Sequence, residues 1–552
     1  MTITRRGLVA AGAAAASAAQ ADSAFWAVTA ERVRRHDEAV DGYVRAQTNS
    51  PGSRWHGGLA DADGLHNGGS AAGLAGAFTT ALVTRQSRHY RSTELLHRLK
   101  MALDFLDRHL TPDGNVNLLF TNFNSPPDTA FAMYSLAGAA SIARRAAERE
   151  IEKLVEPFVR RCAAGIAKGG VHTPNHRWVM CAALAQANAL YPNAGWVRRV
   201  DQWLRETIDI DPDGMYSERS TAAYNGVVNR ALTVTAIRLN RPELFAPVRR
   251  NLEAMLYLLH SDYEVVTEIS ERQDLNTRAT MSGYWLALRA LAVRDGNGMY
   301  ETLARRFDPG LSDLLNYPEL TAAGPTPAPV PDNYERAFPA LKIARIRRGE
   351  ISATMLLNGS SRLFTLRRGA AIVAGVRMAG AFFGKGQFRP QQAARAGRGF
   401  AYGQSLEAAY YQPFDRVQPV GVDRWYELRK ERQATEMCRL HYQTTVTEES
   451  EGFRARFQAH GTADVPVAIE VNLAGDGTLE GCQRLDRVPD AWLLAGPHAS
   501  WRVGGDQIRF GPGKAEHRYT QVRGAEPKLP GVSVYLTGFT PFDHEVLFSW
   551  AS

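Results

Sequence analysis

The chain has 552 residues, of which 45% are hydrophobic and 22% charged, and its formal net charge is +8. This length exceeds one ordinary core, so we expect two domains of a globular protein. The basic balance favours an acidic partner, but no run of Lys and Arg forms a basic tail. We therefore expect an anionic polymer held in a groove, and no nucleic acid.

Residues 1–21 have the pattern of an export signal. The pair Arg5-Arg6 precedes a weakly apolar Ala/Gly stretch and then Ala19-Gln20-Ala21, which fits small-residue cleavage. The pattern resembles a twin-arginine signal, although the Phe and Lys that often follow the arginines are missing. The apolar stretch is too short to span a bilayer, so we expect no membrane anchor and a secreted or periplasmic protein. An ordinary basic helix start is the alternative.

Residues 25–318 show helical periodicity, with apolar residues three and four positions apart over 95–106, 130–140, 179–190 and 252–259. Polar loops recur near positions 64, 114, 170, 214 and 268, at separations of 50, 56, 44 and 54 residues. Each interval fits one antiparallel helix pair. Five such hairpins stacked side by side predict an open α/α ring whose loops gather at one end.

The pattern changes after the ring. Residues 319–335 are rich in proline and predict an extended linker. Residues 336–552 contain short, alternating or β-branched runs between turn residues, which predict an antiparallel β-sheet domain. The chain is therefore expected to be an α+β multidomain protein. Its cysteines show no CxxC spacing and no His cluster, so no zinc site is indicated.

The segment 169–178 is the strongest candidate for a binding site. Pro174 fits a helix start, which places Asn175, His176 and Arg177 together in a first helical turn. The glycine pair before them lets the backbone approach a ligand, and a helix N-terminus favours an anion. We interpret this segment as an anion-binding floor; a capped surface helix with an incidental His is the alternative.

Other polar residues lie on the loops that are expected to share one end of the ring, where functional side chains are usually displayed. The substrate-binding candidates among them are His66, Asn122, Asn124, Tyr216, Glu218, Arg219 and Arg272. In the β-domain, the segment 382–388 places Lys385 between glycines and Gln387 beside aromatics, where they would face a sugar and its acid group. A β-bulge packed by aromatics is the alternative for that segment.

A helical ring, a proline-rich linker and a β-domain, with Asn175-His176 on one loop and Tyr224 after a further 48 residues (224 − 176 = 48), resemble the heparinase II/III-like polysaccharide lyases and the related alginate lyases. The resemblance implies an incomplete α/α toroid followed by an antiparallel β-sandwich. It also implies cleavage of a uronate-containing anionic polysaccharide by β-elimination. The polymer, the oligomeric state and the general base stay open.

The resemblance also implies roles for individual residues. Asn175 and His176 would neutralise the uronate, with Arg177 as an additional hold, and Tyr224 would protonate the departing oxygen. His441 is the β-domain candidate, although no motif surrounds it. From their spacing alone, Arg219 and Arg230 are expected to stabilise a Tyr224 phenolate.

Two other functional classes remain open. A glycoside hydrolase would use a carboxylate pair, and its candidates are Asp128, Asp213, Glu218 and Asp274. A secreted polyanion-binding protein without catalysis would also satisfy the charge, because fold alone does not decide function. No cofactor is predicted; some relatives carry a metal, but no ligand spacing indicates structural calcium or zinc here.

Overall fold

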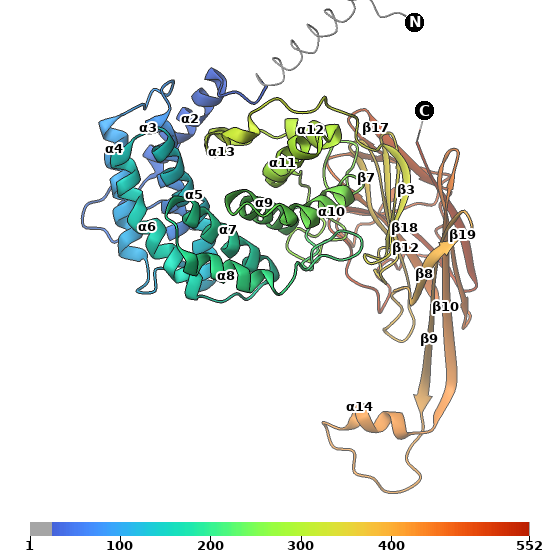
Figure 1. Cartoon of the computed structure of the whole chain (residues 1–552). Coiled ribbons are helices and arrows are strands. Elements are labelled where there is room, and N and C mark those ends of the chain that lie inside the picture. The colour runs from blue at the N-terminus through green and yellow to red at the C-terminus, as the bar shows by residue number, and fades with distance from the viewer. Residues whose placement is uncertain (1–24, 551–552) are drawn as a thin grey trace, which may run out of the picture. The chain divides into compact units, whose positions relative to one another are not determined.

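The computed structural model describes residues 25–550, which divide into two compact units. The first unit contains residues 25–256 and 264–330, and the second contains residues 257–263 and 331–550 (Figure 1). The export pattern at residues 1–21 lies outside the described residues. Between residues 25 and 550, no helix combines the length and the apolar character needed to cross a membrane.

The first unit is built almost entirely from helices, with one short hairpin between two of them. Its helices are α2 (Ala30–Ala46), α3 (Gly68–Val83), α4 (Thr93–His109), α5 (Pro126–Arg145), α6 (Arg149–Lys168), α7 (Pro174–Leu190), α8 (Ala194–Leu204), α9 (Tyr224–Arg238), α10 (Phe245–Met255), α11 (Trp285–Asp295), α12 (Gly298–Arg305) and α13 (Gly310–Asn316). The 3₁₀ turns are η1 (Pro242–Leu244), η2 (Ser282–Tyr284) and η3 (Pro318–Leu320), and the hairpin strands are β1 (Val116–Leu118) and β2 (Asn122–Ser125).

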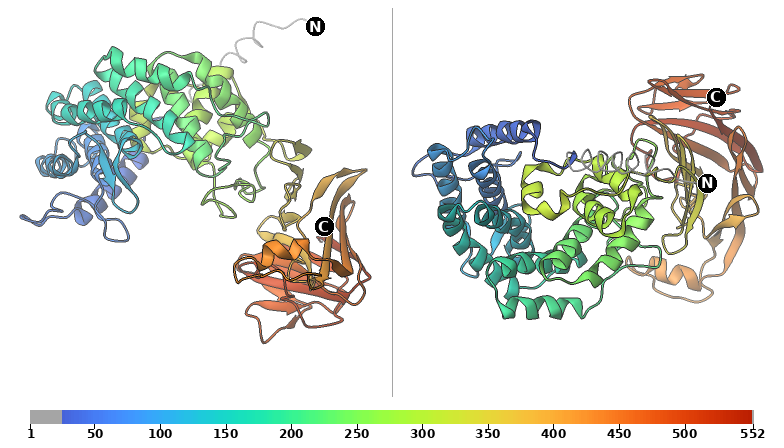
Figure 2. Two further views of the ribbon diagram at one scale, coloured as in Figure 1. Left: turned by 90° about the horizontal axis from the view of Figure 1, so that it is seen from below. Right: turned by 45° about the horizontal axis from the view of Figure 1, so that its top comes forward.

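Five of these helices form the inner wall of an open ring. Helices α3, α5, α7, α9 and α11 pack against one another in series, while α4, α6, α8 and α10 lie outside them (Figure 2). The inner helices are rich in Ala, Gly and Thr and are buried on most faces, because small side chains let neighbouring helices approach closely. The expected stack of five helical hairpins is present.

Two glycine turns explain the spacing of the hairpins. Gly114 and Gly214 each end a Pro-Asp-Gly turn and have positive φ values of 86° and 90°. A Cβ atom at Gly114 would lie 2.4 Å from the carbonyl oxygen of Arg161, and one at Gly214 would lie 2.5 Å from that of Arg250. Each turn therefore packs directly on an outer helix, which requires glycine for both its conformation and its size.

The second unit is a β-sandwich. Its elements are β3 (Asn333–Phe338), β4 (Ile343–Arg348), β5 (Ile351–Leu356), β6 (Phe364–Arg368), β7 (Ala371–Gly380), β8 (Gln392–Ala396), β9 (Gly399–Tyr411), α14 (Trp425–Leu428), η4 (Arg429–Glu431), β10 (Ala434–Glu449), β11 (Gly452–Gly461), β12 (Pro466–Ala474), β13 (Thr478–Glu480), β14 (Gln483–Arg484), β15 (Ala491–Leu493), β16 (Ala499–Val503), β17 (Asp506–Gly511), β18 (Val532–Phe539) and β19 (Phe542–Ser549).

These strands form two sheets that share one apolar core. One sheet has the order β13-β16-β17-β19-β11-β10-β9-β8, and the other has the order β14-β15-β18-β12-β7-β6-β5-β4-β3. Among the described residues every strand pair is antiparallel except β15–β18. Side chains such as Ile469 of β12 and Phe548 of β19 fill the space between the sheets. Apolar and polar residues alternate along these strands in the sequence because each strand buries one face.

The helix predicted over 252–259 is wrong at its end, because α10 stops at Met255 and residues 257–263 join the β-unit. The Tyr334 hydroxyl donates a 2.8 Å hydrogen bond to the carbonyl oxygen of Tyr257. The buried Arg345 guanidinium donates to the carbonyl oxygen of Leu259 at 3.2 Å. Leu258 and Leu259 are instead buried beyond the helix, in a segment whose carbonyl oxygens accept from β-strand side chains.

A buried ionic cluster in the helical unit should carry a large share of its stability. Glu301 is fully buried and accepts hydrogen bonds from Trp26, Arg289 and Arg305. We predict that Glu301→Ala lowers the free energy of unfolding by about 3–5 kcal/mol, because it removes the buried carboxylate that contacts the buried guanidinium of Arg289.

Chemical denaturation monitored by circular dichroism measures this loss. The matched control is Glu31→Ala, which removes an exposed partner of Arg34 and should cost less than about 1 kcal/mol. Equal losses in the two variants would contradict the importance of the buried cluster.

Candidate active site

The predicted anion-binding floor is present, but an internal carboxylate occupies it. Glu218 Oε1 accepts hydrogen bonds from the Asn175 backbone N–H at 2.9 Å and from Asn175 Nδ2 at 2.6 Å. Asn175 is the second residue of α7, so the Glu218 carboxylate lies at the positive end of that helix. Both residues are buried, at 1% and 7% exposure respectively. The start of α7 is therefore tied to the loop that precedes α9.

The environment of Asn175 determines what its side chain offers to a ligand. Its Nδ2 group donates to Glu218 and also to the Thr173 hydroxyl at 3.2 Å, which uses both amide hydrogens. Its Oδ1 atom is buried and has no hydrogen-bond partner among the described residues. A buried, unpaired acceptor is costly unless a ligand satisfies it. Asn175 thus presents an acceptor, rather than the donor that a carboxylate would need.

Arg272 connects Glu218 to the predicted catalytic tyrosine. Its guanidinium forms a 3.1 Å ion pair with Glu218 Oε2 and lies 4.7 Å from the centroid of the Tyr224 ring. The next residue, Gln273, donates a 2.7 Å hydrogen bond from Nε2 to the Tyr224 hydroxyl. Because this hydroxyl already accepts from Gln273, its own proton is directed elsewhere. Tyr224 is partly buried, so that proton can reach a ligand.

A second carboxylate fixes the loop that carries Arg272 and Gln273. Asp274 is buried, and its oxygens accept from the Ser220 hydroxyl at 2.9 Å, the Ala222 N–H at 3.0 Å and the Ser270 hydroxyl at 2.9 Å. Ser220 also accepts from the backbone N–H of Tyr224 at 3.0 Å. The loop and the start of α9 are therefore held as one assembly, which sets the position of Tyr224 relative to Arg272.

His176 follows Asn175 on α7 and is 8% exposed. Burial, together with the neighbouring His172, lowers the pKa of His176 to about 4. The two imidazole rings are 4.7 Å apart at an interplanar angle of 86°. His176 is consequently neutral at neutral pH and offers hydrogen bonding rather than positive charge. The nearby cation that can meet a carboxylate is Arg272.

Three arginines are placed differently from their predicted roles. Arg177 binds Glu206 at 3.0 Å and Asp209 at 2.8 Å, so its guanidinium is committed to these carboxylates. Helical geometry explains the difference, because consecutive residues point to different faces of a helix. Arg219 pairs with Glu271 at 3.1 Å, and Arg230 binds Asp313 through two hydrogen bonds. Arg272, not Arg219 or Arg230, therefore lies against Tyr224.

Several other polar candidates shape the fold. Tyr216 is buried, and its hydroxyl donates a 2.8 Å hydrogen bond to Asn229. Burial holds the pKa of Tyr216 well above its usual range. Asn124 has a φ of 46°, and its amide binds Asp113, Thr111 and Asn115 within one turn. These two side chains are corrected from substrate binding to structural roles.

Asn122 and His66 also contact their own loops. Asn122 donates a 2.8 Å hydrogen bond to Asp128. The charge of Asp128 partly offsets the lowering of the His176 pKa, so Asn122 lies at the periphery of the cluster. His66 shares a 2.8 Å hydrogen bond with the Thr48 hydroxyl and stacks on Trp55 at 5.0 Å. Its ring also lies 6.3 Å from that of Phe105, so His66 contacts the loop before α3 and helix α4.

The three β-unit candidates do not form one cluster. Lys385 is exposed and donates to the carbonyl oxygen of Glu407, whereas Gln387 is buried between Met378 and Glu526. Gln387 forms an isolated antiparallel bridge with Ala379, and its side chain contacts the fold itself. His441 shares a 2.8 Å hydrogen bond with the Ser405 hydroxyl and stacks on His460 at 5.2 Å. It lies in a surface depression on β9, β10 and β11.

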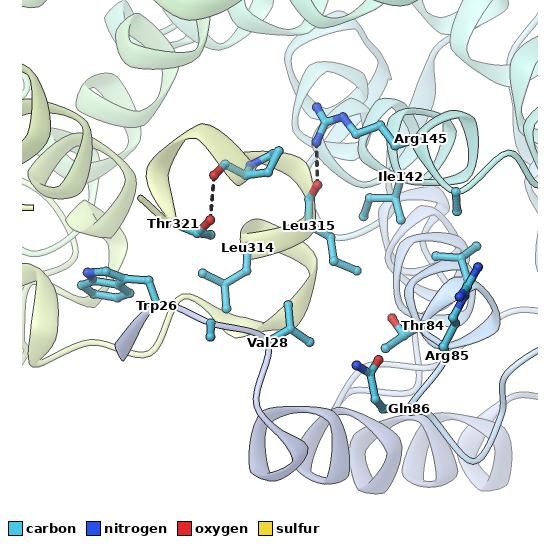
Figure 3. Close-up of a pocket in the computed structure, with 14 residues that line it drawn as sticks. Trp26, Val28, Thr84, Arg85, Gln86, Ile142, Arg145, Leu314, Leu315 and Thr321 are labelled. Carbon is cyan, nitrogen blue, oxygen red and sulfur yellow. Dashed lines mark hydrogen bonds between the residues drawn. The ribbon is translucent and has the colours of Figure 1, made fainter. Parts of the chain in front are cut away.

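The helical unit also has a cavity of about 450 Å³ that contains none of the predicted site residues (Figure 3). It is lined mainly by apolar side chains, including Val28, Ile142 and Leu314. Its Arg145 donates to the carbonyl oxygen of Leu315 at 2.6 Å, and its Thr321 donates to that of Pro318 at 2.7 Å. The polar groups of Arg145 and Thr321 thus stabilise the chain itself, and the cavity contains neither Asn175 nor Tyr224.

Sequence reasoning missed Gln273 and His172 as members of the site. Gln273 follows Arg272 in a loop already recognised as polar, and His172 lies within the segment 169–178. Loop membership was an available signal for both residues. Only the fold shows that Gln273 contacts the Tyr224 hydroxyl and that His172 contacts His176.

Comparisons with known proteins identify the fold. No model of a known protein family matches the chain, and no curated protein matches its sequence. A mutant of the Streptomyces coelicolor A3 chondroitin AC lyase is similar with a TM-score of 0.55 and 14% identity, over 97% of this chain and 83% of that chain. The same lyase in complex with chondroitin sulphate gives a TM-score of 0.53 at 16% identity, over the same shares.

The Paenibacillus xanthan lyase gives a TM-score of 0.55 at 9% identity, over 95% of this chain and 57% of that chain. The chain therefore has the fold of these polysaccharide lyases, an incomplete helical toroid with a β-sandwich, and the predicted fold class is confirmed.

The burial of His176 generates a prediction about pH. Its imidazole should titrate near pH 4 in the folded protein and near its ordinary value of 6.5 when unfolded. The unfolded state then binds more protons between these values, so this residue makes stability fall as the pH drops from 6.5 to 4. Nuclear magnetic resonance of the imidazole, assigned with His176→Gln, measures the titration. A midpoint near 6.5 in the folded protein would overturn the described environment.

Proposed function

With the chain established as having the fold of polysaccharide lyases, we propose that it is one, cleaving a uronate-containing anionic polysaccharide by β-elimination. The observation that carries the proposal is the position of Arg272, which pairs with Glu218 and lies against the ring of Tyr224. A cation and a phenolic hydroxyl are thereby fixed side by side. Uronate elimination needs both, one for the carboxylate and one for proton transfer.

Arg272 is the group that neutralises the uronate in this proposal. The C5 proton next to a carboxylate is only weakly acidic, and its removal places more negative charge on the acid group. Arg272 pairs with Glu218 through one nitrogen, and its side chain is 31% exposed, so further N–H donors are available to a ligand. A fixed guanidinium stabilises the developing charge without reorganisation. The family resemblance implies this role for Asn175 and His176 instead.

Asn175 and neutral His176 orient the sugar in this scheme. The Asn175 Oδ1 atom accepts a hydrogen bond from the substrate, which satisfies its buried lone pairs. His176 contributes one donor and one acceptor, because its low pKa keeps it uncharged. A neutral imidazole next to Arg272 also avoids repulsion between two cations in a partly buried site.

Tyr224 transfers the proton to the departing C4 oxygen. Gln273 donates to the Tyr224 hydroxyl at 2.7 Å, which directs the phenolic proton away from the protein. Loss of that proton leaves a phenolate, whose charge is stabilised by Gln273 and by the adjacent Arg272. When the C5 proton and the leaving oxygen lie on one face of the sugar, the phenolate first accepts the C5 proton, and the hydroxyl so formed then gives that proton to the C4 oxygen, which restores the phenolate at the end of the turnover.

The carboxylates favour a lyase over a glycoside hydrolase. A hydrolase needs a carboxylic acid and a second carboxyl group that both face the scissile bond. Glu218 is engaged by Asn175 and Arg272, and Asp274 is engaged by three loop donors. Asp128 accepts from Asn122 and Ser125 at the start of α5. These carboxylates act as structural acceptors, which leaves little scope for the hydrolytic reaction.

The substrate class follows from the cluster and from the charge of the chain. One of the lyases with this fold was solved in complex with chondroitin sulphate. A net charge of +8 attracts polyanions over long range. Together with the twin-arginine pattern of residues 1–21, this supports an exported enzyme that acts on an extracellular or periplasmic polyuronate.

Replacing Tyr224 with Phe tests the proton-transfer role. We predict that Tyr224→Phe lowers kcat at least about 100-fold, because it deletes the acid and base but keeps the ring. The measurement is the ultraviolet absorbance of the unsaturated uronate product. The control is Tyr216→Phe, which removes a buried hydroxyl bound to Asn229. It should cost about 1 kcal/mol of stability and leave kcat near wild type. Near-normal turnover by Tyr224→Phe would refute the assignment.

A pair of arginine substitutions separates Arg272 from Arg177. Arg272→Ala should lower kcat/KM by about 100-fold or more, because the interaction grows as charge develops on the acid group. Arg177→Ala removes an equal charge next to His176 in the sequence. Because the Arg177 guanidinium is bound to Glu206 and Asp209, kcat/KM should stay within a few-fold of wild type. Steady-state kinetics at low salt measure both variants. A larger loss of kcat/KM in Arg177→Ala than in Arg272→Ala would assign the neutralisation of the uronate to Arg177.

A further inference from the structure

The β9–β10 hairpin extends beyond the sheet to which it belongs. Strand β9 pairs with β8 only as far as Gly403, and β10 pairs with β11 only from Leu440 onward. Within the described chain, residues 404–406 pair as a strand only with residues 440–442 of β10, and residues 407–411 and 434–439 pair as strands only with each other. We name residues 404–439 the arm; it includes α14 and η4 at its tip, as Figure 1 shows.

The arm exposes large apolar side chains that a monomer would normally bury. Tyr426 is 73% exposed and Tyr410 is 59% exposed, and Trp425, Val417 and Met437 are exposed as well. A two-stranded ribbon is only marginally stable without a further packing partner. Contiguous exposed aromatic residues commonly mark a protein interface. The arm therefore has the features of a surface that is covered in the functional state.

Two arginines hold these aromatic residues in place. Arg429 lies 5.3 Å from the ring centroid of Tyr411 and 5.6 Å from that of Tyr426. Arg432 lies 4.8 Å from the centroid of the Trp425 ring. Tyr, Trp and Arg are the residues that most often dominate binding energy at interfaces. Because cation–π contacts restrain the rings before binding, less side-chain entropy is lost when a partner covers them.

The charges of the arm identify its partner. Within residues 404–439 there are six cations (Arg416, Arg424, Arg429, Lys430, Arg432, Arg439) and six anions (Glu407, Asp415, Asp423, Glu427, Glu431, Glu436), whereas the whole chain carries +8. Some charges of each sign, including Arg416, Lys430 and Asp423, form no ion pair among the described residues. A neutral surface gives a polyanion no net attraction, but a surface of mixed sign can complement a copy of itself.

We propose that the arm is the interface through which two copies of this chain associate. A two-fold axis brings the same patch of both copies together, so cations of one arm meet anions of the other while Tyr410, Trp425 and Tyr426 are buried between them. The partner copy thereby supplies the packing surface that an isolated two-stranded ribbon lacks. This interface goes beyond the proposed elimination reaction and does not depend on it.

The mass of the protein in solution tests the interface. Size-exclusion chromatography with light scattering, over a series of protein concentrations, should give twice the chain mass for the wild type. The double variant Tyr410→Ala and Tyr426→Ala should raise the dimer dissociation constant at least about 100-fold, as expected for two interface anchors. The control is Phe120→Ala, which removes an equally exposed aromatic side chain, at 66% exposure, from the β1–β2 hairpin. It should leave the dimer unchanged.

A deletion guards against misfolding of the double variant. Replacing residues 412–433 with Asn-Gly closes the ribbon with a two-residue hairpin turn and removes the tip, and this variant should also be monomeric with an unchanged circular dichroism signal from the sandwich. A monomeric wild type, or a dimer that neither variant weakens, overturns the proposal. A monomer whose arm variants lose affinity for immobilised polyuronate would also overturn it and assign the arm to the polymer.

Discussion

The carboxylate of Glu218 is the contact on which the site depends. It binds the first turn of α7 through Asn175 and the loop after α10 through Arg272, while residing itself in the loop before α9. Three segments that are far apart in the chain are therefore joined by one buried anion. This buried anion is stabilised by the backbone and side-chain amides of Asn175 at the helix N-terminus and by the guanidinium of Arg272. The same arrangement orients Arg272 toward Tyr224, so the fold and the chemistry share one interaction.

The site achieves its charge balance with few ionised groups. Glu218 compensates Arg272, and burial keeps His176 neutral. In the proposed reaction, an incoming uronate would meet one partly exposed guanidinium, one neutral imidazole and one amide oxygen. A carboxylate would then be bound without a dense cationic pocket. The hydrogen bonds that Asp274 accepts from its own loop also keep that carboxylate from repelling an anionic ligand beside Tyr224.

The features that sequence predicted correctly are those with local causes. The Pro-Asp-Gly turns at Gly114 and Gly214 require positive φ values, and the helices and strands follow periodicities that one face of each element imposes. Asn175 and Tyr224, both catalytic candidates from the sequence, are linked in the structure through Glu218 and Arg272, and their catalytic roles stay predictions. Contacts across the chain were less predictable. Arg177 was favoured because it adjoins His176, but the turn of the helix directs it to Glu206 and Asp209, and Arg272 reaches Tyr224 instead.

Polar residues such as Asn124 and Gln387 show a related limit, because a loop uses the same residue types to satisfy its backbone and to bind ligands. Elimination by this cluster is tested most directly by mass spectrometry of the products formed from uronate polymers in heavy-oxygen water. Elimination predicts unsaturated product ends that are lighter by one water than the ends left by hydrolysis, and it predicts no heavy oxygen at the cleaved bond. Incorporation of heavy oxygen at the cleaved bond would show hydrolysis and contradict the account.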